Sequence, residues 1–67
     1  MSPEEEARHL AVAEVELRRE FPHVPAHAVR EAIDIEHKAF DRAAVRDFVP
    51  LLVVRDARVR LRNRRVD

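Results

Sequence analysis

Proline is the only strong breaker of regular structure in this chain, which has four prolines and no glycine. Pro22 and Pro25 stand close together, and the residue before a proline is disfavoured in a helix. On both sides of this pair, apolar residues recur at steps of three and four, the period of an amphipathic helix. The sequence therefore predicts a chain built of helices with short connections.

The first predicted helix covers residues 3–21. Ser2 is a suitable N-cap, Pro3 fits the first helical position, and Glu5 completes a capping box. An apolar stripe follows along one face of this helix. It consists of Ala7, Leu10, Ala13, Leu17 and Phe21.

Two further helices are predicted, over residues 25–39 and 42–62. Pro25 can open the second helix, and Asp41 is a credible N-cap for the third. Pro50 falls inside the third helix, where it removes a backbone hydrogen bond and predicts a bend. The predicted fold is a single all-α domain, a three-helix bundle whose third helix is long and bent near Pro50. Residues 63–67 lack periodicity, so we expect a frayed tail.

The third predicted helix carries more apolar residues than one face can hold. Seven consecutive apolar residues run from Phe48 to Val54, and in a helix they spread around most of the circumference. We expect one stripe to face the other two helices. A second stripe, about 140° away, has the spacing of a helix–helix seam. The first stripe is Val45, Phe48, Val49, Leu52 and Val59, and the second is Pro50, Val54, Ala57 and Leu61.

A chain of 67 residues has little of its own with which to cover the second stripe. Small domains without disulfides or metals often gain stability by forming oligomers. We therefore expect a homodimer, with Val12 and Val15 of the first helix as the next candidates for its interface. The expected interface residues are Pro50, Leu51, Val53, Val54, Ala57 and Leu61. The expected core residues are Leu10, Leu17, Phe21, Val29, Ile33, Phe40, Val45, Phe48, Val49 and Leu52.

The segment from Val45 to Val53, followed by Arg55 and an arginine-rich end, resembles a known module. This module is the small three-helix dimerisation domain at the N-terminus of actinobacterial low-molecular-weight-phosphatase-like arsenate reductases, which also occurs in short free-standing proteins. The resemblance covers most of residues 7–62 and implies a fold and a dimerisation role. It implies no reaction, because the phosphatase-type site needs a cysteine in a phosphate-binding loop and this chain has no cysteine. A second protein, such as a phosphatase-like enzyme bound in trans, is the other partner class that the resemblance leaves open.

Two carboxylates, Glu36 and Asp56, interrupt apolar stripes, and a buried carboxylate usually has a partner. One interpretation is a raised pKa and acid–base chemistry. The other is an ion pair with Arg46, Arg55, Arg60 or an arginine of a second subunit. No nucleophile or base accompanies these carboxylates in the sequence, so we favour the ion pairs and predict a protein that is not an enzyme.

Four histidines raise the question of a metal site. His23 and His27 are four residues apart, but Pro25 lies between them, so they need not share one helix face. Asp34 and His37 lie one turn apart, like one arm of a carboxylate–histidine site, and no second motif of this kind follows. We expect surface histidines, with no metal and no cofactor.

Basic and acidic residues cancel at 13 each, but they are segregated along the chain. Glutamates dominate residues 1–20 and arginines dominate residues 42–67, a pattern that suits antiparallel helix pairing or head-to-tail contact. The arginines between residues 55 and 65 favour an alternative function, a small DNA-binding helical protein. Against this alternative, the middle of that helix is apolar on several sides, and Asn63 is the only amide side chain.

A second alternative is a ubiquitin-binding bundle of the CUE or UBA type, which Phe21-Pro22 and Leu51-Leu52 resemble loosely. The methionine expected before the Phe-Pro pair is Glu20 here, and the usual loop glycine is missing. Twelve arginines against one lysine, with ten alanines and ten valines, indicate a GC-rich bacterial genome, in which ubiquitin is not expected.

Hydropathy gives no sign of a membrane segment, because no stretch of about 18 apolar residues occurs. The N-terminal residues are acidic, unlike those of a secretory signal. We therefore expect a cytoplasmic protein without a membrane partner.

Overall fold

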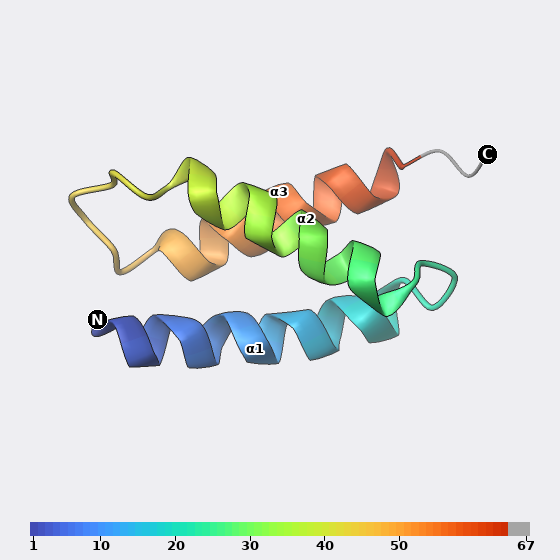
Figure 1. Ribbon diagram of the computed structural model, residues 1–67, viewed down its shortest axis with the longest axis horizontal. Helices are drawn as coiled ribbons and strands as arrows, with labels where there is room; N and C mark the ends of the chain where they lie inside the picture. Colours follow the sequence, from blue (N-terminus) through green and yellow to red (C-terminus); the bar gives the residue numbers. More distant parts are fainter. Residues whose placement is uncertain (65–67) are drawn as a thin grey trace.

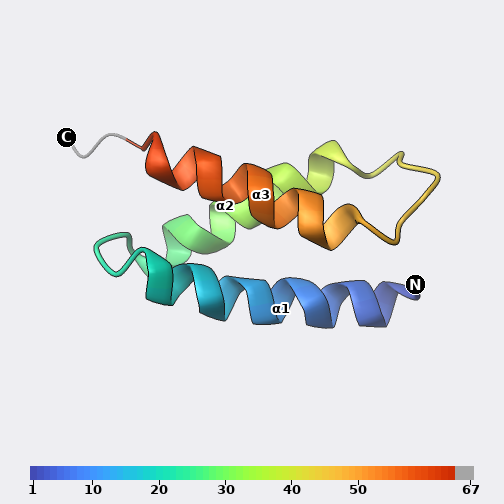
Figure 2. The same ribbon diagram turned by 180° about the vertical axis from the view of Figure 1, so that it is seen from behind.

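The computed structural model describes residues 1–64, which form three α-helices. These are α1 (Pro3–Glu20), α2 (Ala26–Ala39) and α3 (Val49–Arg62). α1 and α3 run in the same direction and α2 runs in the opposite one (Figure 1). α2 lies in front of α3 in Figure 1 and behind it in the reversed view of Figure 2, so these two helices form a crossed pair alongside α1. The predicted all-α three-helix bundle is confirmed.

The start of α1 follows its capping residues. The Ser2 side chain accepts a hydrogen bond from the backbone N–H of Glu5 at 3.2 Å, and Pro3 occupies the first turn. The N-terminal amine lies 3.4 Å from a carboxylate oxygen of Asp47. The beginning of the chain therefore sits beside the segment that leads into α3.

α3 is shorter than predicted and begins at Val49. Residues 41–48 form a non-helical connection, and Phe48, rather than Asp41, is the N-cap. Pro50 consequently lies in the first turn, where a missing N–H removes no helical hydrogen bond. A proline inside a longer helix would cost about 3 kcal/mol, which favours this late start over the bend that we predicted.

The core lies between the three helices and uses small and medium-sized side chains. Val45 and Phe48, which we expected in the core, are 68% and 64% exposed, so the prediction is wrong for both. Phe21 and Phe40 pack against the core while partly buried, and Leu52 is half-buried. The buried apolar residues are Leu10, Ala13, Leu17, Val29, Ala32, Ile33, Val49, Val53, Ala57 and Leu61.

At the other end of α3, Asn63 is the C-cap. The rest of the predicted frayed tail, residues 65–67, lies outside the described residues. Within residues 1–64, no helix is both long and apolar enough to cross a bilayer.

Candidate interaction site

Most of the predicted dimer interface lies inside the chain itself. Val53 and Ala57 have no exposed surface, and Leu61 is 5% exposed. Pro50 is also buried, Val54 is half-buried, and of the six residues only Leu51 is largely exposed. The face of α3 that we expected to bind a second copy is therefore the face that packs into the chain's own core. Small side chains such as Ala57 allow α3 to approach its neighbours closely, which the larger Phe48 and Leu51 would prevent.

The opposite face of α3 carries the exposed apolar side chains. Phe48, Leu52 and Val59 are four and seven residues apart, so they lie within about 40° of one another around a helix. Leu51 flanks them and is 67% exposed, and Val59 is 49% exposed. We call these four residues, Phe48, Leu51, Leu52 and Val59, the α3 stripe. Val45 precedes the stripe in the connection and extends the exposed apolar surface.

A second, smaller exposed apolar group lies on α1. Val12 and Val15 are 58% and 47% exposed, on the side of α1 opposite the buried Leu10 and Leu17. Two valines expose less apolar area than the α3 stripe with its phenylalanine and leucines. The α1 group is therefore the weaker candidate for an interface.

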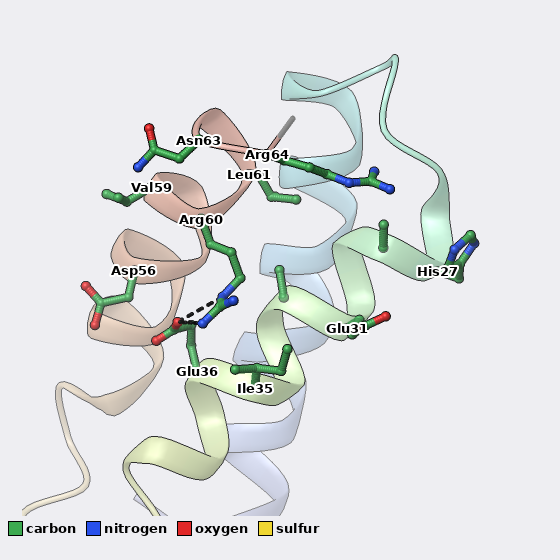
Figure 3. A pocket seen from close by; sticks show the side chains of 12 residues that line it. His27, Glu31, Ile35, Glu36, Asp56, Val59, Arg60, Leu61, Asn63 and Arg64 are labelled. Carbon is green, nitrogen blue, oxygen red and sulfur yellow. Dashed lines mark hydrogen bonds and ion pairs between the residues drawn. The ribbon is translucent and has the colours of Figure 1, made fainter. Parts of the chain in front are cut away.

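An open groove of about 730 Å³ runs between α2 and the C-terminal half of α3. Figure 3 shows Leu61 pointing into it, while the Arg60 side chain reaches across to Glu36. The lining mixes both signs of charge, and residues 1–64 contain no group of three or more His, Asp or Glu side chains arranged to hold a metal. The lining residues are His27, Ala28, Glu31, Ala32, Ile35, Glu36, Asp56, Val59, Arg60, Leu61, Asn63 and Arg64.

The two carboxylates singled out in the sequence both form ion pairs. Glu36, with 17% of its side chain exposed, accepts hydrogen bonds from Nε and Nη2 of Arg60 at 3.1 and 3.0 Å. Asp56 accepts one from its neighbour Arg55 at 3.1 Å. Both arginines were among the expected partners. Neither carboxylate is fully buried, and these contacts give them a structural role within one chain.

The most buried carboxylate, Glu6, was missed by the sequence analysis. Its Oε1 accepts a hydrogen bond from Nε of Arg46 at 3.0 Å, and its Oε2 one from Nη2 at 2.8 Å. Nε2 of His37 lies 2.8 Å from the same Oε2. The hydrogen bonds from Arg46 and then His37 lower the pKa of Glu6 from 4.5 to about 2, outweighing desolvation, and the pKa of Arg46 is raised in turn. Glu6 is four residues before Leu10, so the heptad-like spacing of the α1 stripe would have placed it at a buried position.

The segregated charges are used within the chain. On α3, Arg58 pairs with Glu20 of α1 and Arg60 pairs with Glu36 of α2. In the connection, Arg46 pairs with Glu6. The basic C-terminal part thus finds carboxylate partners on both other helices. Because Arg58 and Arg60 already face carboxylates, they offer less positive charge to a nucleic-acid phosphate than their number indicates.

Comparisons of this chain with protein-family models, with the curated proteins and with solved structures find no match. The case for a function therefore depends on the α3 stripe, the groove and the ion pairs.

Proposed function

We propose that this chain is an interaction module that forms a homodimer through the α3 stripe. The observation that carries the proposal is the exposure of Phe48 and Leu51, 64% and 67%, on a helix whose other face already closes the core. Groups of exposed large apolar side chains on one helix face are typical of interaction sites. The sequence resemblance to a dimerisation domain supports the same function, and it covers α1 and α2 as well as α3.

The free energy of apolar burial favours dimerisation through the α3 stripe. Burying a leucine or phenylalanine side chain contributes about 1.5–3 kcal/mol, and a dimer buries each member of the stripe twice. This gain offsets the loss of translational and rotational freedom on association. A 67-residue chain with no disulfide also has a small core, so the added burial stabilises the fold as well.

Charge favours a second copy as the occupant of the stripe. The chain has a formal net charge of zero, so two copies do not repel one another over long distances.

The stripe shares its face with Arg55 and Arg62, which lie three residues after Leu52 and Val59. A parallel pair of α3 helices would place each of these arginines against the same arginine of the second copy. An antiparallel pair places the apolar N-terminal end of the stripe against Val59 of the other copy and separates like charges.

The test is the solution mass of matched variants, measured by light scattering over a wide concentration range. We expect the wild-type chain and Val12→Asp to have twice the mass of one chain, and Leu51→Asp to be monomeric. Both substitutions place an aspartate at an exposed apolar position, so neither disturbs the core. A dimer that survives Leu51→Asp but not Val12→Asp would move the interface to α1. A wild-type monomer at every concentration would overturn the proposal.

A further inference from the structure

The connection between α2 and α3 presents part of the apolar surface but has few backbone restraints of its own. Val45 and Phe48 in this segment are each about two-thirds exposed. The backbone hydrogen bonds among the described residues lie towards its ends. The N–H groups of Asp41 and Ala43 donate to Lys38 and Phe40 at one end, and the carbonyls of Arg46 and Phe48 accept from Val49 and Leu52 at the other. Another contact must fix the middle of the segment.

Arg46 supplies that contact. It lies between Val45 and Phe48 in the sequence, yet its side chain points inward and is only 27% exposed. Its Nε and Nη2 groups donate to the two carboxylate oxygens of Glu6 at 3.0 and 2.8 Å, and Nη1 donates to the carbonyl of Phe40. A two-point contact of this kind fixes the orientation of the guanidinium as well as its position.

Glu6 is itself held in place from a third direction. Its carboxylate is 12% exposed and lies 2.8 Å from Nε2 of His37, near the end of α2. The first turn of α1, the last turn of α2 and the connection therefore meet at one carboxylate. Val53 and Ala57, buried residues of α3, belong to the apolar core, against which Phe40 also packs.

We propose that the Glu6–Arg46 pair is a positioning clamp for the interaction surface, an inference that rests on the proposed homodimer. The clamp holds residues 41–48 in the one conformation that turns Val45 and Phe48 outward together, toward a second copy. Arg46 is a positioning residue, because it acts on the partner through its neighbours in the sequence. Loss of the clamp leaves the helices packed and releases the connection, so dimer affinity falls before the fold does.

The test compares Glu6→Gln and Arg46→Lys with a control pair, Glu20→Gln and Arg58→Lys. The Glu6→Gln change turns one acceptor oxygen into a donor that faces another donor, and the Arg46→Lys change removes the two-point contact. The control residues also form an arginine–carboxylate pair, at the opposite end of α1. Dimer dissociation constants come from sedimentation equilibrium, and backbone motion comes from amide hydrogen exchange at Ala43 and Val49, the hydrogen-bonded amides at the two ends of the connection.

For Glu6→Gln and Arg46→Lys we expect a dissociation constant raised about tenfold or more. Exchange should rise more at the hydrogen-bonded amides of Ala43 and Val49, at the ends of the connection, than in the middle of the helices. The control pair should stay within about twofold of wild type. Unchanged dimer affinity in both clamp variants would overturn the inference. Exchange that rises equally throughout all three helices would also overturn it, because the pair would then support only the fold. A wild-type chain that is monomeric overturns the proposed function itself, and that result is seen before any variant is compared.

Discussion

Arg58 of α3 donates its Nε–H to both carboxylate oxygens of Glu20, at 2.9 and 3.1 Å, and so ties the C-terminal ends of two parallel helices together. Both side chains are about one-third exposed. Exposed ion pairs contribute about 0–1 kcal/mol. We therefore expect Arg58→Gln to lower the free energy of unfolding by less than about 1 kcal/mol, measured by urea denaturation. A loss above about 2 kcal/mol would mean that this pair is a main tether between α1 and α3.

Acid should weaken the fold through Glu6. Because the pKa of Glu6 is lowered from 4.5 to about 2 in the folded chain, its contribution is complete above about pH 5 and is lost as the pH falls toward 2. The full shift corresponds to about 3 kcal/mol, and solvent screening in so small a protein reduces it to about 1–2 kcal/mol. Urea unfolding at a series of pH values measures this loss. In Glu6→Gln the acid-dependent loss should be smaller by the same amount, and an identical pH profile would contradict the assignment.

The proposed antiparallel dimer predicts a specific cross-linking pattern. The chain has no cysteine, so single-cysteine variants report on one position each. We expect a mixture of Phe48→Cys and Val59→Cys chains to form a disulfide between unlike chains under oxidation, and Phe48→Cys alone to form almost none. Gel electrophoresis without reductant measures the products. Efficient cross-linking of Phe48→Cys with itself would indicate a parallel dimer.

Ala57 provides a test of which face of α3 closes the core. It has no exposed surface, so Ala57→Leu should overpack the core and cost about 1–3 kcal/mol of folding free energy. Ala11→Leu on the exposed side of α1 is the matched control and should change stability by less than about 0.5 kcal/mol. Thermal and urea unfolding of both variants give the comparison. An Ala57→Leu chain as stable as the wild type would indicate that Ala57 lies on the surface.

Pro50 should be replaceable at small cost. In the first turn of α3 the missing N–H of Pro50 removes no helical hydrogen bond. Pro50→Ala should therefore change stability by no more than about 1 kcal/mol. A proline that bends the middle of a longer helix would instead release about 3 kcal/mol when replaced by alanine. Urea denaturation distinguishes the two cases. A gain of about 3 kcal/mol in the free energy of unfolding would support the long helix over residues 42–62.

The helical periodicity of the sequence predicted three helices and the approximate ends of the first two. It also showed that α3 has two apolar faces, because both stripes repeat at helical spacing. It placed Val49 correctly in the core but Val45 and Phe48 wrongly, since helical spacing extended that stripe back through residues that precede α3. The contact between helices instead selects Val53 and Ala57, whose small side chains let the backbones approach. That choice depends on the distance between helices, and the periodicity of one helix carries no information about this distance.

The ion pairs show the same division between local and non-local information. The interruption of apolar stripes by Glu36 and Asp56 predicted carboxylates with arginine partners, and Arg60 and Arg55 fill those roles. The Glu6 cluster joins residues 31 and 40 positions apart. Its only local signal was that Glu6 continues the Leu10 stripe by one turn, and the acidic first turn of α1 masked it.

The contact between the N-terminal amine and Asp47 has a practical consequence for how the protein is handled. Any affinity tag or fused domain joined to Met1 would emerge next to Val45 and Phe48, where it can shield the surface that a partner must reach. The C-terminal end of α3 lies at the opposite end of the bundle (Figure 1), so a C-terminal fusion keeps clear of Val45 and Phe48 of its own chain and, in the antiparallel pair, lies beside those of the second copy. Two preparations of the same chain that differ only in the position of the tag can therefore give different solution masses, and a monomer observed with an N-terminal fusion should be re-measured after its removal.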